Sequence, residues 1–399
     1  MRVMKRILFG SLAAAMLVAG SAQAQVKVGN AMAVTGPIPD LVAPMVAAVD
    51  LAAKHINEQG GVLGQSYEVV RADSACDPSA AVDAVTKLIN VDQVLGILGP
   101  VCSGATIAQA ESVSIPAGVV TLSVSASSPA ITSMESGTDL VFRAAASDAY
   151  QGVALADLTL ANGIKEIAVS YANDDYNAAI AQVFAKVYAE KGGKVVAMEA
   201  HEPNKASYRS EVQTLSKGTN ALALFAYYGS SGITIMRNAL ETGAFDTFIG
   251  ADGMLAQEVI DQIGAENLSN ATFTTSASDD TTDAYKAWQA LAEAADVPPA
   301  DPFVPNSYDA TFMMAMAIEK AGSADRGKIA AALREVANAP GEVILPGEWA
   351  KAKKLIGEGK DVNYVGGAGP QDFDENGDVQ GSFSKNTVVG GKWVATLIK

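Results

Sequence analysis

EIAVSYA, residues 166–172, is a short apolar run that leads through NDDY into the longer run NAAIAQVFAKVYAEKGG (177–193) and then into KVVAMEA (194–200). The first and last runs are rich in β-branched residues and lie between polar turns, as strands do. The middle run has helical periodicity and stops at Gly-Gly. Strands that are apolar on both faces are typical of parallel sheets covered by helices. The pattern therefore predicts an α/β protein.

The alternation of strand and helix patterns extends along most of the 399 residues. Such a length exceeds what one hydrophobic core usually organises, so two domains are expected, with a boundary near 143–147, where VFRAAASD closes one group of units. The other expected strands are VKVGNAMAV (26–34), YEVVRA (67–72), VLGILG (94–99), GVVTLSV (118–124), ALALFAY (221–227), FDTFIGA (245–251), NTVVG (386–390) and KWVATLI (392–398). ATFTTSAS (271–278) is expected to be an extended crossing. The later helical patterns cover 281–296, 305–322 and 325–338.

Residues 1–24 predict a secretory signal peptide. A basic start precedes the apolar run ILFGSLAAAMLVAG, and Ala22-Gln23-Ala24 fits the small-x-small cleavage pattern. The apolar run is shorter than the about 18–20 residues that span a bilayer. We expect cleavage near Ala24 and a mature chain that starts near Gln25, outside the cytoplasm.

The charge balance argues against nucleic acid as a partner. The chain has 28 basic and 44 acidic residues, a net charge of −16, and no basic cluster that reverses this locally. Such a surface repels nucleic acid and anionic lipid at long range. Solubility is its simplest role, and charge alone does not identify a ligand.

Cys76 and Cys102 are the two cysteines of the sequence. An even pair in an oxidising compartment, without nearby histidines, favours a disulfide over a metal site. Closing this loop contributes about 3–4 kcal/mol to stability. Cys102 is then a crosslink and not a nucleophile.

Two loops that follow predicted strands carry candidate binding residues, because parallel sheets bind ligands outside the carboxyl ends of their strands. ILGPVCSGAT (97–106) places Ser103 where a helix begins, and a hydroxyl beside free backbone N–H groups suits an anion. The alternative is that Ser103 only caps its helix. TLSVSASSP (121–129) adds hydroxyls, among them Ser123 and Ser125, that no cap pattern fully explains.

Three loops in the second half of the chain offer a different chemistry: NDDYN (173–177), AYYGSSG (226–232) and GADG (250–253). A carboxylate there suits a cation, and tyrosines supply a flat, half-polar surface. With one wall for an anion and the other for a cation, the cleft fits a zwitterion such as an amino acid. The candidates on this second wall are Tyr176, Tyr228 and Asp252.

The remaining motifs do not indicate catalysis. FDENGD (373–378) lacks the glycine and glutamate positions of a calcium loop, so a hairpin turn is expected. No G-x-S-x-G elbow, phosphate loop with lysine or complete G-x-G-x-x-G is present. His55 and His201 lack partners that would form a catalytic pair. We predict no catalytic residue, no cofactor and no metal.

Several motifs together are familiar: AMAVTGP, HINEQGGVLG, DSACDPSAAV, ILGPVCSGAT, FRAAASDAYQG, AYYGSSG and FIGADG. With them the chain resembles the periplasmic substrate-binding proteins of branched-chain amino acid ABC transporters, the Leu/Ile/Val-binding family, over essentially all the mature sequence. The resemblance implies a type I periplasmic binding protein: two Rossmann-like lobes with parallel sheets, joined by three crossovers that act as a hinge. We expect an N-terminal lobe of 25–144 plus about 276–380, and a C-terminal lobe of 145–275 plus about 381–399.

The resemblance also implies roles for individual residues. The matching cysteines form a disulfide, and the serine that matches Ser103 binds the ligand carboxylate. The loop that matches Ser123 and Ser125 contributes a backbone carbonyl and a hydroxyl. The acidic residue that matches Asp252 meets the ammonium group. The tyrosines that line the pocket match Tyr176 and Tyr228.

Three departures from the family leave the ligand open. Asp252 replaces the usual glutamate, IPDLV (38–42) has no aromatic residue, and SVSASSP is two residues longer than usual. An aromatic amino acid, an amide or a small carboxylate stay alternatives to leucine. The expected function is a monomeric periplasmic solute receptor that delivers its ligand to an inner-membrane ABC permease. The rivals are a periplasmic sensor for amides or small acids, and a secreted enzyme that uses Ser103.

Overall fold

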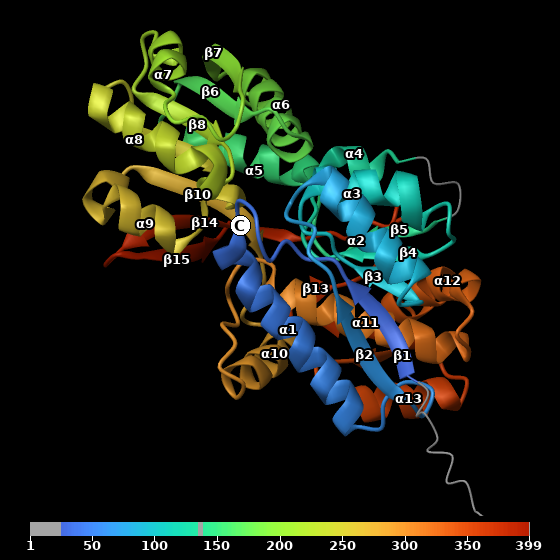
Figure 1. Cartoon of the computed structure of the whole chain (residues 1–399). Coiled ribbons are helices and arrows are strands. Elements are labelled where there is room, and N and C mark those ends of the chain that lie inside the picture. The colour runs from blue at the N-terminus through green and yellow to red at the C-terminus, as the bar shows by residue number, and fades with distance from the viewer. Residues whose placement is uncertain (1–24, 135–138, 399) are drawn as a thin grey trace, which may run out of the picture.

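The computed structural model describes residues 25–134 and 139–398, so the predicted signal peptide lies outside the described residues. Within these residues the strands form two main sheets, each covered by helices, and a small third sheet. Figure 1 shows two lobes, one built around each main sheet. The predicted α/β class with parallel sheets and two lobes is confirmed. No helix in the described ranges is long and apolar enough to cross a membrane.

The N-terminal lobe is built on a parallel sheet with the strand order β2-β1-β3-β4-β5. Its central strands are buried on both faces, which explains why their sequences are apolar without alternation. The strands are β1 (Gln25–Asn30), β2 (Ser66–Arg71), β3 (Gly96–Leu98), β4 (Val120–Ser123) and β5 (Val141–Arg143). The helices between them are α1 (Pro39–Glu58), α2 (Pro78–Asn90), α3 (Ser103–Gln109) and α4 (Pro129–Thr132).

Local signals explain where several of these helices begin and end. Pro39 opens α1, where a missing N–H costs nothing. The helix stops at the Gly-Gly pair, where the N–H of Gly61 donates to the carbonyl of Ile56 at 3.0 Å. Asp77 caps α2 by accepting the N–H of Ala80 at 2.8 Å. The predicted helical stretches are thus bounded by ordinary capping chemistry.

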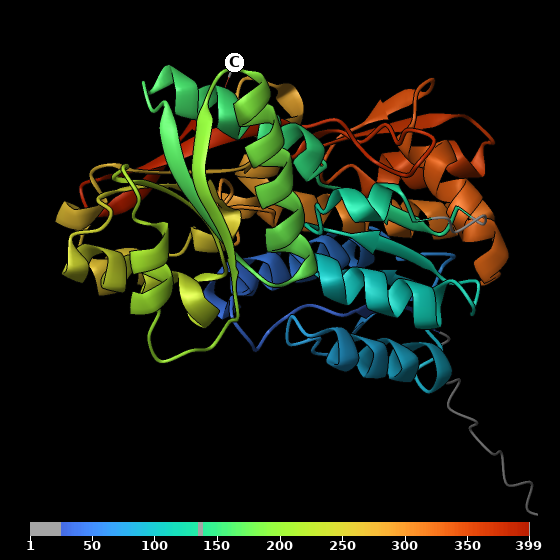
Figure 2. The ribbon, with the colours of Figure 1, turned by 90° about the horizontal axis from the view of Figure 1, so that it is seen from above.

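Residues far along the chain complete the N-terminal lobe. Figure 2 shows the orange segment of the chain beside the blue and cyan N-terminal elements. Helix α11 (Val304–Ala321) is buried around most of its circumference and packs against α1 and against α12 (Arg326–Ala337). The other elements of this segment are α10 (Asp283–Glu293), α13 (Trp349–Gly357), β11 (Glu342–Ile344), β12 (Val362–Gly366) and β13 (Gly369–Pro370).

The C-terminal lobe is built on a mixed sheet with the order β15-β14-β10-β9-β8-β6-β7. Strands β6 to β10 run parallel, and β14 and β15 extend the sheet in antiparallel fashion. The strands are β6 (Glu166–Ala172), β7 (Lys194–His201), β8 (Ala221–Phe225), β9 (Thr247–Ala251), β10 (Ala271–Ala277), β14 (Ser382–Val389) and β15 (Lys392–Leu397). The helices are α5 (Asp148–Ala161), α6 (Asp175–Glu190), α7 (Arg209–Leu215), α8 (Ile233–Thr242) and α9 (Gln257–Ile263).

The chain passes between the lobes three times in the described residues, as the predicted fold requires. The first crossing, 144–147, joins β5 to α5; the second, 278–282, joins β10 to α10; the third, 371–381, leads from β13 to β14. The crossings have little regular secondary structure of their own.

Most predicted strands are present, with ends shifted by a few residues. The expectation missed β5 and the small sheet β11-β12-β13, whose strands have two to five residues each. The stretch FDENGD forms a tight turn in the third crossing, where the N–H of Gly377 donates to the carbonyl of Asp374 at 3.1 Å.

Candidate functional site

A pocket lies between the two lobes, at the carboxyl ends of both parallel sheets. The empty space between its walls, counted with open solvent, is about 300 Å³. Loops after β1, β3 and β4 form one wall, and loops after β6, β8 and β9 form the other. The position agrees with the rule for α/β proteins that binding residues follow the strands.

The loop after β3 is held by the predicted disulfide. Cys76 and Cys102 are bonded, with 5.4 Å between their Cα atoms, so that prediction is confirmed. Cys102 is the residue before α3, and Ser103 opens this helix with its side chain buried. The crosslink ties the start of α3 to the loop after β2, which restrains the part of the wall that carries Ser103.

The serines of this wall have fixed hydrogen-bond directions. The backbone N–H of Ser128 donates to Oγ of Ser103 at 3.2 Å, so Ser103 keeps its own hydroxyl hydrogen for another acceptor. Ser125 does the reverse: it donates to the carbonyl of Val101 at 3.0 Å and keeps its lone pairs. Both line the pocket. One wall therefore offers a donor at Ser103 and an acceptor at Ser125.

Ser123, the last residue of β4, is placed differently from the expectation. Its hydroxyl donates to the carbonyl of Pro100 at 2.8 Å and accepts the N–H of Ala126 at 3.0 Å. It is fully buried and is not part of the pocket lining. Its side chain therefore joins the loops after β3 and β4, and Ser127 lines the pocket further along the same loop.

Asp252 is the polar centre of the opposite wall. It follows β9, is 6% exposed and accepts a hydrogen bond from the hydroxyl of Tyr176. The ring of Tyr176 stacks on that of Tyr227, with 5.6 Å between centroids and 18° between planes. Burial raises the pKa of Asp252 to about 6, although its hydrogen bonds act in the opposite direction.

A second carboxylate, Asp148, lies close behind this site at the start of α5. Its Oδ2 accepts the hydroxyl of Ser127 at 3.0 Å, while its Oδ1 is buried without a hydrogen-bond partner among the described residues. Burial, followed by the charge of Asp252, raises the pKa of Asp148 well above its usual range. Asp252 is the acidic side chain on the pocket lining, which has no lysine or arginine, and this balance favours a cationic group of a ligand.

Tyr228 does not line the pocket; its neighbour Tyr227 does. The hydroxyl of Tyr228 instead accepts the backbone N–H of Asp40 from the other lobe at 3.1 Å. Beside it, the N–H of Gly229 donates to the carbonyl of Pro37 at 3.1 Å. These contacts cross between the lobes, so Tyr228 joins the two lobes in this structure.

Glycine is required where the lobes approach each other. A Cβ on Gly229 would lie 2.5 Å from the carbonyl oxygen of Pro37. A Cβ on Gly104, in α3, would lie 2.6 Å from a carboxylate oxygen of Asp175, at the start of α6. A larger side chain at Gly229 would hold the lobes apart because it meets backbone, whereas at Gly104 it meets the end of the Asp175 side chain, which can rotate away.

Apolar side chains complete the pocket. Ile38 and Leu41 come from the start of α1, and Phe303 comes from the residue before α11. Sequence reasoning missed all three, together with Tyr227 and Asp148, whereas Ser127 belongs to the hydroxyl cluster of TLSVSASSP that it singled out. Phe303 places an aromatic ring in the pocket, which IPDLV does not. It comes from a distant segment of the chain, and no local sequence pattern links that segment to the site.

The pocket lining contains no histidine among the described residues. His201 is buried away from the pocket, with Nδ1 at 2.9 Å from Oγ of Ser170 and Nε2 at 2.9 Å from Oγ of Ser231. Burial lowers its pKa to about 4. Across residues 25–134 and 139–398, no three His, Cys, Asp or Glu side chains are grouped to hold a metal ion.

The chain is similar in sequence and structure to known proteins. A family model described as periplasmic binding protein matches residues 25–354. A leucine-, isoleucine-, valine-, threonine- and alanine-binding protein of Pseudomonas aeruginosa is 32% identical over 81% of this chain and 87% of its own. A chemotactic signal transduction substrate-binding protein of Halobacterium salinarum is 27% identical over 87% of this chain and 83% of its own. A crystal structure of a leucine-binding protein from Thermotoga maritima superposes with a TM-score of 0.78 at 26% identity, covering 94% and 98% of the two chains.

Proposed function

We propose, from the premise that this chain belongs to the periplasmic binding protein family, that it captures an α-amino acid and delivers it to an ABC permease of the inner membrane. The observation that carries the proposal is the opposed polarity of the two pocket walls. Ser103 keeps a hydroxyl hydrogen for a carboxylate. Asp252 and Ser125 keep acceptors for an ammonium group.

The binding mode follows from this polarity. The ligand carboxylate lies against Ser103, and its ammonium group lies between Ser125 and Asp252. The side chain of the ligand packs against Ile38, Leu41 and Phe303, so a small apolar or aromatic side chain fits best. The Pseudomonas aeruginosa relative, whose name includes five amino acids, supports this ligand class.

Hinge closure explains how binding is coupled to delivery. We propose that the lobes, 25–144 with 276–380 and 145–275 with 381–399, move about the three crossings. Closure brings Ser103 and Asp252 onto one ligand, which shifts the population toward the closed form because only that form uses both walls. The family consists of substrate-binding proteins, and we propose that no ligand is turned over. The mature chain acts as a monomer in the periplasm after cleavage near Ala24.

Thermal denaturation of the purified mature protein tests the ligand class. The panel is L-leucine, L-isoleucine, L-valine, L-threonine, L-alanine and L-phenylalanine. At 100 times Kd a ligand adds about 2.7 kcal/mol of stability, which is a shift of a few degrees in Tm. Matched probes with one charged group each are 4-methylpentanoate and 3-methylbutan-1-amine. We expect both to bind at least about tenfold more weakly than L-leucine if leucine is the ligand. An absence of shift for every amino acid, or equal binding of the carboxylate alone, contradicts the proposal.

A sensor role is the second candidate, supported by the chemotactic relative from Halobacterium salinarum. Such a protein would bind an amide or small acid in the same cleft and present its closed form to a receptor. Reconstitution of the loaded protein with a candidate ABC permease for amino acids separates the two. Ligand-dependent ATP hydrolysis supports transport, and its absence with a binding-competent protein favours the sensor.

A further inference from the structure

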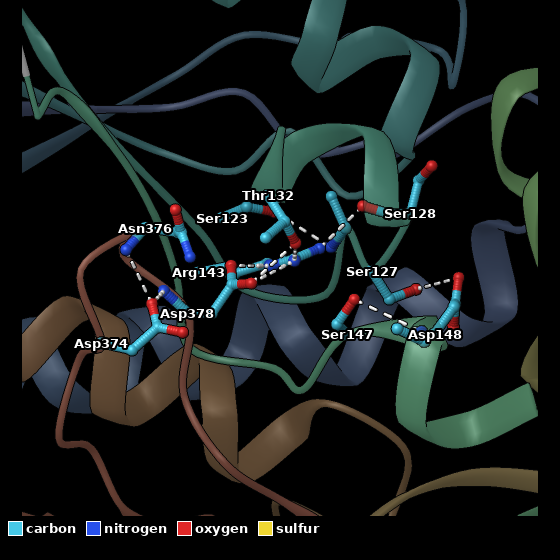
Figure 3. A network of polar contacts seen from close by, with 12 residues as sticks. Ser123, Ser127, Ser128, Thr132, Arg143, Ser147, Asp148, Asp374, Asn376 and Asp378 are labelled. Atoms are coloured by element: carbon cyan, nitrogen blue, oxygen red, sulfur yellow. Dashed lines mark hydrogen bonds and ion pairs between the residues drawn. The ribbon is translucent and has the colours of Figure 1, made fainter. Parts of the chain in front are cut away.

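A buried ion pair connects two of the interlobe crossings with the pocket. Arg143 ends β5 where the first crossing begins, and its side chain is 0% exposed. Asp378 lies in the third crossing. Nε and Nη2 of Arg143 donate to Oδ1 and Oδ2 of Asp378 at 2.5 and 2.7 Å, a bidentate contact visible in Figure 3. Two charges are stable without water only when such pairing is nearly complete.

The FDENGD turn is shaped to present Asp378. Oδ1 of Asp374 accepts the N–H groups of Asn376 and Asp378 at 2.8 and 3.0 Å. The carbonyl of Gly377, which has φ of +80°, accepts the N–H of Arg143 at 3.0 Å. Backbone and side chain of Arg143 are therefore both held by the same turn, which gives this motif a structural use.

Arg143 extends this contact to the pocket loop. Its Nη1 donates to the carbonyl of Ser128 at 2.8 Å, and its Nη2 donates to Oγ1 of Thr132. Thr132 in turn donates to Oδ2 of Asp378 at 2.7 Å. Figure 3 shows the guanidinium lying between Asp378 on one side and Ser128 and Thr132 on the other. The guanidinium thus fixes one end of the loop that carries Ser125 and Ser127.

Ser128 makes contacts in three directions. Its carbonyl accepts from Arg143 at the hinge, and its N–H donates to Oγ of Ser103 at the pocket. Its hydroxyl donates to the backbone carbonyl of Asp175 in the opposite lobe at 3.4 Å. The carbonyl and the N–H of Ser128 belong to successive peptide units that meet at its Cα, so a hydrogen bond on each side restricts rotation about that Cα. The direction of the N–H therefore depends on the position of Arg143.

We infer that Arg143, held by Asp378, is a positioning residue for ligand binding. It fixes Ser128 so that the Ser128 N–H occupies a lone pair of Ser103, and the hydroxyl hydrogen of Ser103 is left for the ligand carboxylate. This inference rests on the proposed function, because it concerns how the carboxylate is bound. It adds a hinge residue that touches no ligand atom but selects which way a binding hydroxyl points.

The test is a double-mutant cycle on ligand binding. The ligand is L-leucine, or the amino acid of the panel that binds more tightly. Its Kd is measured by calorimetry at a temperature where each variant is folded. The variant is Arg143→Met with Asp378→Leu, because replacing both charges avoids an orphaned buried charge. We expect its Kd to rise about tenfold, the effect of one misplaced hydrogen bond to a charged group. In a Ser103→Ala background the same pair of changes should leave Kd unchanged within about twofold, because the Ser103 hydroxyl that Arg143 positions is already absent.

Asp139→Asn is the matched control. This change removes the ion pair between Asp139 and Arg334. Arg334 also holds the FDENGD turn, because it donates to the carbonyl of Glu375 at 3.2 Å, but it does not contact Ser128. Its Kd should stay at the wild-type value. If the double variant does not fold, Asp378→Asn should give a smaller rise with the same dependence on Ser103.

Two outcomes overturn the inference alone: a variant that binds as tightly as the wild type, or an equal loss of affinity with and without the Ser103 hydroxyl. If Arg143 and Asp378 only stabilised the fold, the loss of affinity would be equal with and without the Ser103 hydroxyl. A wild-type protein that binds no amino acid of the panel overturns the proposed function, and the inference with it.

Discussion

Neutralising Asp252 is the sharpest probe of the cation-binding wall. Asp252→Asn keeps the shape of the side chain and leaves an oxygen for the hydroxyl of Tyr176, but it removes the charge that faces an ammonium group. A hydrogen bond to a charged group contributes about 1.5–3 kcal/mol, so Kd should rise about 10- to 150-fold. Because the carboxylate is 6% exposed and hardly screened by water, the upper half of this range is expected.

The pH dependence of ligand affinity tests the role of the Asp252 charge independently. Burial raises the pKa of Asp252 to about 6 in this structure, so the carboxylate is ionised above this pH and protonated below it. Binding of an ammonium group requires the ionised form. Affinity should be constant above about pH 7 and fall by about tenfold for each unit below about pH 6. Burial and then the charge of Asp252 also raise the pKa of the nearby Asp148 carboxyl.

Isothermal titration calorimetry between about pH 5 and pH 8 measures both effects. Asp175→Asn is the control, because Asp175 is exposed on the same side of the cleft and does not line the pocket. Asp252→Asn should lose the acid limb that Asp252 contributes, while Asp175→Asn keeps it. A Kd for Asp252→Asn within twofold of wild type would refute the reasoning. So would a wild-type affinity that rises as the pH falls.

Three further outcomes are expected. Ser103→Ala should weaken carboxylate binding by about 1–3 kcal/mol without a comparable loss of folding stability, as calorimetry and urea unfolding will show. Tyr228→Phe removes the acceptor for the N–H of Asp40, and a loss of about 1 kcal/mol from the closed form should raise Kd about fivefold; an unchanged Kd would exclude a role in closure. Replacing Cys76 and Cys102 by serine should lower the free energy of unfolding by about 3–4 kcal/mol in urea, and a change below about 1 kcal/mol would contradict the crosslink argument.

The sequence predicts those parts of the fold whose signals are local. Runs such as EIAVSYA and ALALFAY are strands because their apolar character spans both faces, and β6 begins and ends as expected. Strand β5 has three residues inside VFRAAASD, too few for a periodic signal, and it pairs only because β4 lies beside it. The small sheet depends in the same way on tertiary pairing.

The residues of the candidate site also fall into those that local sequence predicts and those that depend on tertiary structure. Ser103, Ser125, Tyr176 and Asp252 line the pocket because they follow strands, and the carboxyl ends of parallel strands converge. The choice between Tyr227 and Tyr228 depends on how the π-helical turn η2 (Tyr228–Gly232) leaves β8, which pattern does not specify. Phe303 comes from another part of the chain, so its place follows only from tertiary structure. Which of these residues contact a ligand stays a prediction.

The path of the chain also has a consequence for biosynthesis. Strand β10 gains its antiparallel neighbour only from β14, near the end of the chain, after the whole segment from α10 to β13 has been made. Until then the sheet of the C-terminal lobe has an open edge, which can pair with another molecule. A product truncated before β14 should therefore aggregate rather than persist as a half-functional lobe.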